Sequence, residues 1–175
     1  MKIIDTAIPD VKIIELKTFG DSRGVFFENF YANRYQEMLG ISDVFVQDNF
    51  SRSQKNVLRG LHYQVEQSQD KLVTVLSGCV FDVAVDIRKD SPSYGQWVGV
   101  ELSGENRRQI WIPKGFAHGF YVLSDFADFY YKCTEYYRPD AEKTVMWDDP
   151  TLNIEWPITD TPIISDKDRK GEYLK

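Results

Sequence analysis

Two histidines carry the most specific chemistry in this sequence, because the 175 residues contain no others. His62 lies in the run VLRGLHYQ (57–64), three residues after Arg59, and His118 lies in WIPKGFAHGF (111–120). An imidazole changes its charge near neutral pH, so it can take up or release a proton during a reaction. A buried guanidinium beside it would need a partner or an anion. Proton transfer, metal binding and plain structural packing are the three alternatives for His62.

A metal site is not expected from the ligand pattern. Transition-metal sites in small β-barrels commonly use two histidines two positions apart, a nearby Glu and a third His on a later strand. Here Gln64 occupies the position two residues after His62, and His118 is the only other histidine. The sequence therefore predicts no bound metal. A satisfied core histidine remains an alternative for both positions.

Three further residues could take part in chemistry, although each also has an ordinary structural explanation. Lys71 follows Asp70 in SQDKLV, where it could be an exposed lysine at the start of a strand. Asp70 would raise the pKa of Lys71 if the two side chains were close. Tyr131 shares the inward face of its expected strand with Phe129, and Arg23 in GDSRGVF could be a turn charge.

The elements that must position these residues read as short β-strands separated by Gly, Ser, Asn and Pro. Strands are expected within 72–92, on either side of a Ser77-Gly78 turn, and over 96–103, 108–113, 118–123 and 127–137. One helix is expected over 32–40, with Tyr35, Met38 and Leu39 as its apolar stripe, and the tail SDKDRKGEYL could hold another short one. This pattern predicts an all-β jelly roll of the cupin type, formed by a single domain over residues 1–175.

Composition narrows the function classes. The net charge of −6 argues against binding nucleic acid through a basic surface, and no apolar run is long enough for a membrane span. The first residues, MKIIDTAIPD, contain acidic positions that a secretory signal would lack. Cys79 and Cys133 are expected to be reduced core thiols. These features favour a cytoplasmic protein.

Several long segments resemble the dTDP-4-dehydrorhamnose 3,5-epimerase family of cupin-fold sugar-nucleotide epimerases. The resemblance covers nearly the whole chain. Its segments are FGDSRGVFFE (19–28), FVQDNFSRS (45–53), NVLRGLHYQ (56–64), KLV (71–73), VFDVAVDIRKDSPSYGQWVGVELS (80–103), WIPKGFAHGF (111–120), YKCTEYYRP (131–139), WDDP (147–150) and SDKD (165–168).

The resemblance implies a reaction and a set of residue roles. Family members invert C3 and C5 of dTDP-4-dehydro-6-deoxy-D-glucose to give dTDP-4-dehydro-L-rhamnose, without metal or organic cofactor. It implies that His62 is the general base, Asp168 its carboxylate partner and Tyr131 the opposing acid, with Lys71 and His118 near the C4 oxygen. The expected phosphate and nucleotide contacts are Glu28, Gln47, Asn49, Arg59, Glu142 and Lys167. A homodimer is also implied, in which Arg23 reaches the neighbouring site.

This sequence departs from the family pattern before Lys71, where SQDKLV replaces the usual AQGKLV and the preceding loop is slightly shorter. Close alternatives are an epimerase that inverts only C3, or one that acts on another nucleoside-diphosphate 4-keto-hexose. A non-catalytic cupin that binds sugar nucleotides is the alternative of a different class.

Overall fold

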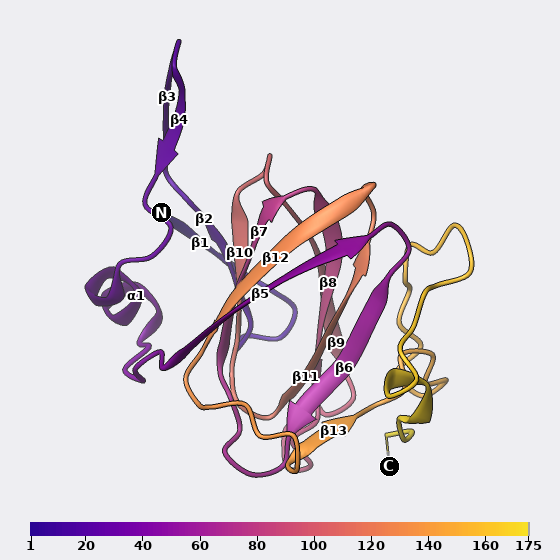
Figure 1. Ribbon diagram of the computed structural model, residues 1–175. Helices are drawn as coiled ribbons and strands as arrows, with labels where there is room; N and C mark the ends of the chain where they lie inside the picture. The colour runs from indigo at the N-terminus through magenta and orange to yellow at the C-terminus, as the bar shows by residue number, and fades with distance from the viewer. Residues whose placement is uncertain (175) are drawn as a thin grey trace.

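Two antiparallel sheets face each other in the computed structural model, which describes residues 1–174 (Figure 1). The six-stranded sheet has the order β1 (Lys2–Asp5), β2 (Lys12–Glu15), β10 (Arg108–Ile112), β7 (Lys71–Ser77), β12 (Phe126–Cys133) and β5 (Gln47–Gln54). The five-stranded sheet has the order β13 (Glu142–Thr144), β6 (Leu58–Gln64), β11 (Phe116–Val122), β8 (Cys79–Asp86) and β9 (Trp97–Ser103). The predicted jelly-roll sandwich is therefore confirmed.

Consecutive strands from β5 to β8 alternate between the two sheets. The turn at Ser77-Gly78 follows β7 and precedes β8 as predicted, but it carries the chain from the six-stranded sheet to the five-stranded one. Gly78 has a φ of +77°, and an added Cβ would lie 2.0 Å from the carbonyl oxygen of Phe126. Only glycine fits such a position without strain. The consecutive strands β5 to β8 thus form opposite walls of the space between the sheets.

The hydrophobic core fills most of that space. Its buried residues include Val73, Val75, Val80, Ala84, Val98, Val100, Leu102, Ile110, Phe120 and Phe129. The predicted two faces of β8 are both buried. Val80 and Ala84 point between the sheets, whereas Val83 and Val85 pack with Leu152 on the outer side. The tail after Pro150 therefore acts as a cover for the outer face of the five-stranded sheet.

Local irregularity places the histidines. His118 on β11 pairs with His62 on β6, and the register then shifts so that Phe120 pairs with Arg59. Gly60 has a φ of +115°, and a Cβ there would lie 2.6 Å from the Gly119 Cα. Strict alternation would send Arg59 and His62 to opposite faces of β6, because they are three residues apart. The irregular backbone at Gly60 instead lets both side chains line one cavity.

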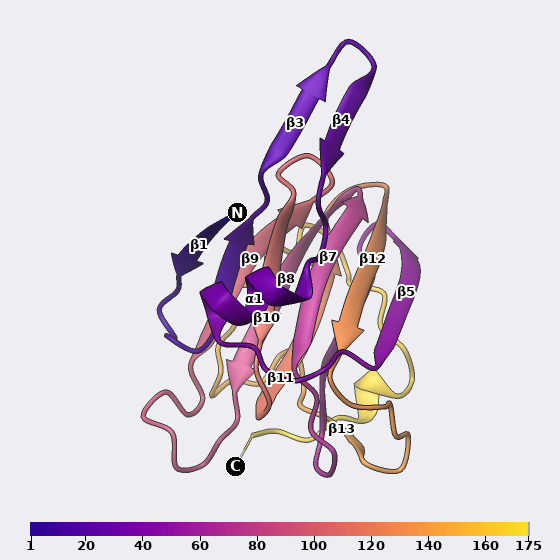
Figure 2. The same ribbon diagram turned by 90° about the vertical axis from the view of Figure 1, so that its left-hand side faces the viewer.

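Three elements lie outside the sandwich. Strands β3 (Thr18–Asp21) and β4 (Gly24–Phe27) form a hairpin that projects away from the sheets (Figure 2). Helix α1 (Ala32–Leu39) matches the prediction and ends at Gly40 in the left-handed conformation. Its expected stripe is partly wrong, because Met38 is exposed while Tyr35 is buried. The tail holds a short 3₁₀ helix, η1 (Asp168–Lys170).

Some strand boundaries differ from the prediction. The strand expected over 127–137 ends at Cys133, and the one expected over 118–123 begins at Phe116. The second strand expected within 72–92 ends at Asp86, whose carboxylate accepts hydrogen bonds from Arg88, Ser91 and Ser93 in the following loop. In the part of the chain described, no helix is long and apolar enough to cross a membrane.

The close approach of β6 and β11 yields a testable prediction. A Cβ at Gly119 would lie 2.5 Å from the carbonyl oxygen of Arg59, so Gly119→Ala should push the two strands apart. We expect a loss of about 1–3 kcal/mol in the free energy of unfolding, measured by urea denaturation. Gly20→Ala is the matched control, because its Cβ would meet nothing closer than 3.7 Å. Equal stability of the two variants would contradict the prediction.

Candidate active site

A cavity of about 340 Å³ opens between the two sheets. The five-stranded sheet contributes Arg59, His62 and His118, and the six-stranded sheet contributes Lys71 and Tyr131. The remaining lining residues are Gln47, Asn49, Phe50, Ser51, Gln69, Gly119, Phe120, Phe129, Tyr137, Glu142 and Lys167. The two walls of the cavity therefore carry different groups that can exchange protons.

His62 forms a hydrogen-bonded pair with Asp168. The distance from His62 Nε2 to Asp168 Oδ1 is 2.7 Å, and the second carboxylate oxygen accepts a hydrogen bond from the Gly60 amide at 3.3 Å. Asp168 is only 2% exposed. Burial favours a higher pKa for this carboxyl group, but His62, the Gly60 amide and the Lys167 charge together outweigh it, so the net shift in pKa is downward. An ionised carboxylate only accepts hydrogen bonds, so Nε2 of His62 carries the proton and Nδ1 is the basic atom.

The second histidine has a carboxylate partner that the sequence interpretation missed. His118 Nε2 lies 3.0 Å from Asp82 Oδ2, and both side chains are buried. Burial lowers the pKa of His118 despite the opposing effect of Asp82, so the ring is neutral near pH 7. The available signal was the polar residue itself. Asp82 interrupts the apolar strand VFDVAV at a position that points between the sheets.

Lys71 points into the cavity from β7. Burial lowers its pKa, and the nearby Cys133, Glu142 and Asp82 oppose that shift. The expected effect of Asp70 is not seen, because adjacent residues on a strand point to opposite faces. The Asp70 carboxylate instead accepts hydrogen bonds from the Thr134 hydroxyl and the Lys114 amide, both at 2.8 Å. The unusual SQDKLV sequence therefore leaves the environment of the Lys71 amine intact.

Tyr131 lies on the wall opposite His62. It pairs in register with Asn49 on β5 and Val73 on β7 and packs edge-on against Phe129, with ring centroids 5.9 Å apart. Burial raises the pKa of Tyr131 to about 12, and the neighbouring Cys133 and Glu142 contribute to this shift. The phenol therefore keeps its proton throughout the physiological pH range and can donate it.

Arg59, Gln47 and Asn49 lie at one end of the cavity. Arg59 is exposed rather than buried, so the expected need for a buried partner does not arise. Its Nε donates to the Ser53 hydroxyl at 3.0 Å. Gln47 donates to Asn49 at 2.9 Å and accepts from the Tyr137 amide at 2.8 Å. These groups offer several hydrogen-bond donors and one fixed guanidinium to a ligand.

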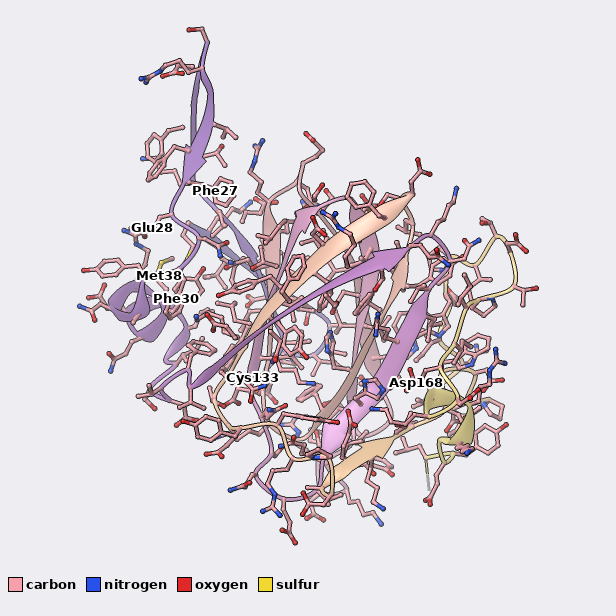
Figure 3. The ribbon with its side chains drawn as sticks, viewed as in Figure 1. Phe27, Glu28, Phe30, Met38, Cys133 and Asp168 are labelled. Atoms are coloured by element: carbon pink, nitrogen blue, oxygen red, sulfur yellow. The ribbon has the colours of Figure 1, made fainter. Side chains whose placement is uncertain are left out.

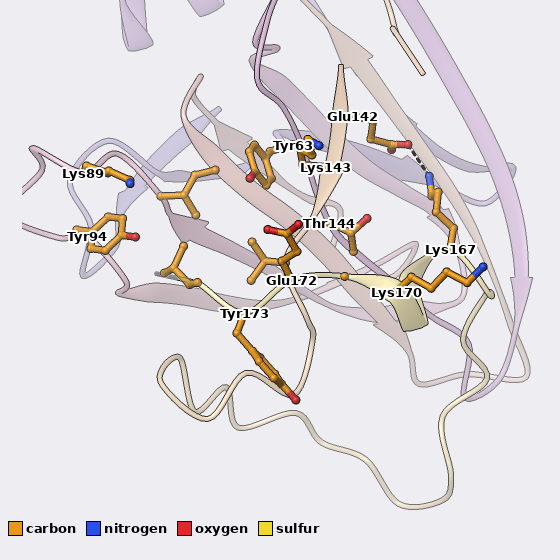
Figure 4. Close-up of a pocket in the computed structure, with 14 residues that line it drawn as sticks. Tyr63, Lys89, Tyr94, Glu142, Lys143, Thr144, Lys167, Lys170, Glu172 and Tyr173 are labelled. Carbon is orange, nitrogen blue, oxygen red and sulfur yellow. Dashed lines mark hydrogen bonds and ion pairs between the residues drawn. The ribbon is translucent and has the colours of Figure 1, made fainter. Parts of the chain in front are cut away.

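Glu142 and Lys167 form a wall between this cavity and a second one of about 520 Å³ (Figure 4). Lys167 Nζ lies 2.5 Å from Glu142 Oε2, which also accepts a hydrogen bond from the Tyr137 hydroxyl at 2.9 Å. The other Glu142 oxygen lies 3.9 Å from His62 Nδ1. Tyr137 was also not predicted to be a site residue, although it lies in the segment YKCTEYYRP (131–139).

Arg23 and Glu28 do not reach the cavity within one chain. Arg23 lies at the tip of the β3–β4 hairpin, where it binds Asp21 at 2.6 Å. Glu28 follows β4 and pairs with Arg34 of α1, far from Asp168 (Figure 3). Any role for these two residues in the site therefore requires another copy of the chain.

Among residues 1–174, no three His, Cys, Asp or Glu side chains cluster as metal ligands would. Each histidine is instead held by one carboxylate, Asp168 or Asp82.

Comparisons with known proteins show which family the chain resembles. The sequence profile of the dTDP-4-dehydrorhamnose 3,5-epimerase family matches residues 5–175. A Salmonella typhimurium protein of that name is 57% identical over 175 residues, covering 99% of this chain and 96% of its own. A Legionella pneumophila 3,5-epimerase, crystallised with dTDP-4-keto-L-rhamnose, is 64% identical with a TM-score of 0.98, over 99% of this chain and 92% of that one.

The same fold also occurs in a Streptomyces bikiniensis 3'-monoepimerase crystallised with dTDP-quinovose. That chain is 30% identical, with a TM-score of 0.92 over 97% of this chain and 86% of its own. The family profile matches nearly the full length of this chain, and each of the two more similar 3,5-epimerases aligns over nearly the full length of both proteins. This chain belongs to the dTDP-4-dehydrorhamnose 3,5-epimerase family.

Proposed function

We propose that this protein inverts C3 and C5 of dTDP-4-dehydro-6-deoxy-D-glucose, which yields dTDP-4-dehydro-L-rhamnose. One observation supports this most directly. His62, paired with Asp168, and the Tyr131 phenol line one cavity from opposite sheets. Inversion requires that a proton leave one face of the sugar and that another arrive on the opposite face. A base and an acid on facing walls meet that requirement.

The proposed chemistry begins at the carbons beside the C4 ketone. His62 Nδ1 takes the proton from C3 or C5, and the electron pair of the broken C–H bond moves toward O4 to form an enolate. Asp168 accepts the Nε2–H hydrogen bond and stabilises the imidazolium that results. Tyr131 then donates its proton to the opposite face of the same carbon. Because each step moves only protons, the reaction requires no redox cofactor.

Lys71 is proposed to donate a hydrogen bond to the negative charge that develops on O4, and His118 is proposed to lie beside it with its Nε2–H directed to Asp82. The lysine amine and the imidazole both line the cavity, from opposite sheets. Donors held in a cavity with little water need no rearrangement when charge appears, and loss of one such donor costs roughly 10²–10³ in rate at other sites. Asp82 would keep the His118 ring in place.

The nucleotide is proposed to occupy the end of the cavity near Arg59, Gln47, Asn49, Glu142 and Lys167. A guanidinium binds diphosphate oxygens through forked hydrogen bonds, and the amide side chains can bind a base or ribose. We further propose that the protein is cytoplasmic, because Cys79 and Cys133 are both free thiols in the structure.

A homodimer is proposed to complete the site. The projecting hairpin exposes Phe19, Val25 and Phe26, which are 54%, 47% and 69% accessible. Exposed apolar residues grouped on one element mark a surface that binds another molecule. In this arrangement Arg23 and Glu28 would reach the cavity of the partner, where Arg23 could bind the diphosphate.

The related 3'-monoepimerase makes a C3-only reaction the second candidate, because the two activities share one fold. We expect double inversion, because the much more similar relatives are 3,5-epimerases. The measurement is NMR of dTDP-4-dehydro-6-deoxy-D-glucose incubated with the enzyme in D₂O. Deuterium should appear at both C3 and C5. Deuterium at C3 alone would establish the monoepimerase, and UDP-, CDP- and GDP-linked substrates assayed in parallel would reveal another nucleotide preference.

Replacing the base and the acid should have different effects. His62→Ala removes the group that starts both steps, so exchange at C3 and C5 should fall by about 10²–10⁴-fold. Tyr131→Phe keeps the base, so it should retain some exchange while product formation is lost. Both rates come from the same NMR assay, with circular dichroism to confirm folding. Near-normal turnover by His62→Ala would show that another residue is the base.

Mixing two inactive variants tests the shared site. Arg23→Ala and His62→Ala should each have little activity alone, because one lacks the partner's arginine and the other lacks the base. After unfolding and refolding together in equal amounts, they should recover about a quarter of wild-type activity, since mixed dimers contain one intact site. Each variant refolded alone is the control. Full activity of Arg23→Ala alone would remove Arg23 from the site.

A further inference from the structure

A short segment between β12 and β13 borders the cavity without being part of a sheet. Residues 135–138, here called the rim segment, belong to no helix or strand of the described chain and run past the end of the sandwich where β6 finishes (Figure 1). Tyr137 within this segment is 45% exposed and lines the cavity that contains His62. The position of the Tyr137 ring therefore depends on whatever fixes the rim segment.

Gln64 makes three hydrogen bonds around the rim segment. Its Nε2 donates to the carbonyl oxygens of Tyr136 at 3.2 Å and Gln67 at 2.8 Å, and its Oε1 accepts from the Arg138 amide at 2.8 Å. Gln64 is the last residue of β6 and is only 6% exposed, so water has little access to replace these partners. Loss of the side chain would leave buried donors and acceptors unpaired.

Two further glutamines bind the rim segment from other parts of the chain. Gln69, which lies just before β7, donates from Nε2 to the Glu135 carbonyl at 2.8 Å. Gln47 of β5 accepts from the Tyr137 amide at 2.8 Å. Both of these glutamines also line the cavity. Three glutamine side chains thus fix four consecutive residues of the backbone.

The need to pair buried polar groups explains Gln64 taken alone. It does not explain why three separate side chains, rather than strand pairing, fix the chain at the point where Tyr137 meets the cavity. Side-chain anchors give a single position to a segment that has no ladder of its own. A ring that is already in place does not have to be ordered when a ligand binds, so less free energy of binding is lost.

We propose that Gln64 and Gln69 are positioning residues that hold Tyr137 at the edge of the cavity and thereby strengthen binding of the nucleotide part of the substrate. The inference rests on the proposed function, which places the nucleotide at the end of the cavity that Gln47 lines. Neither Gln64 nor Gln69 takes part in the proton transfers. Their loss should weaken binding and leave the chemical step unchanged.

The test measures binding of dTDP by isothermal titration calorimetry. Gln69→Leu removes one anchor at a half-buried position, so the protein should fold, and its Kd for dTDP should rise about 3- to 10-fold, as loss of one hydrogen bond predicts. Gln64→Leu removes three contacts and should raise the Kd further. Gln54→Leu is the matched control, because it makes the same change at an exposed residue of β5, and it should bind dTDP as the wild type does.

A double-mutant cycle tests whether the anchors act through Tyr137. Tyr137→Ala should weaken binding of dTDP, and adding Gln69→Leu to it should cause no further loss. Hydrogen-exchange mass spectrometry of the peptide 134–141 should show faster exchange in both anchor variants but not in Gln54→Leu. If the two losses add independently, Gln69 contacts the nucleotide directly and the proposal is wrong.

Catalysis provides a further readout. With dTDP-4-dehydro-6-deoxy-D-glucose, KM should rise in parallel with the Kd for dTDP, while kcat and deuterium incorporation at C3 and C5 stay at the wild-type level. A fall in kcat with unchanged KM, or an unchanged Kd in both anchor variants, would overturn the proposal. Wild-type protein that binds no dTDP would instead overturn the proposed function, and the nucleotide role of Tyr137 with it.

Discussion

The hydrogen bond between His62 and Asp168 is the interaction on which the site depends, because it joins β6 of the five-stranded sheet to the C-terminal tail. The tail is fixed by more than this contact. Ile163 and Glu172 form bridges with Val57 and Val145, and Trp156 packs against Phe81 on the outer face of β8. Apolar burial of the tail against the outer face of the sheet thus helps to set the position of the Asp168 carboxylate beside His62. The contacts that pack the tail therefore also hold Asp168 within hydrogen-bond distance of His62.

Charge is distributed unevenly across the cavity. Burial lowers the pKa of Lys71 and of His118 and raises that of Tyr131, so each is moved toward its neutral form. Asp168 and Glu142 behave differently, because their partners keep both carboxylates ionised near His62. Negative charge therefore gathers beside His62. Under the proposed function, an enolate formed in the cavity would lie beside the Lys71 amine and the Tyr131 phenol.

Much of the fold could be predicted from the sequence, because period-two patterns in segments such as QWVGVELS directly reflect one buried face. The helix that ends at Gly40 was predicted in the same way. The resemblance to the epimerase family supplied Asp168, which no spacing argument could connect to a histidine 106 positions earlier. Asp82 was missed because its strand has both faces buried, so the alternation did not show which one bordered a cavity. Register shifts such as that between His118 and Phe120 depend on backbone contacts with another strand, and short-range patterns do not encode them.

The order of these elements along the chain has a consequence for biosynthesis. During translation the strands of both sheets are made before η1, so all of them precede Asp168 out of the ribosome. His62 then lacks the acceptor that orients its ring. A polypeptide that ends before Asp168 therefore lacks the carboxylate that aligns the His62 imidazole, even if its two sheets have formed.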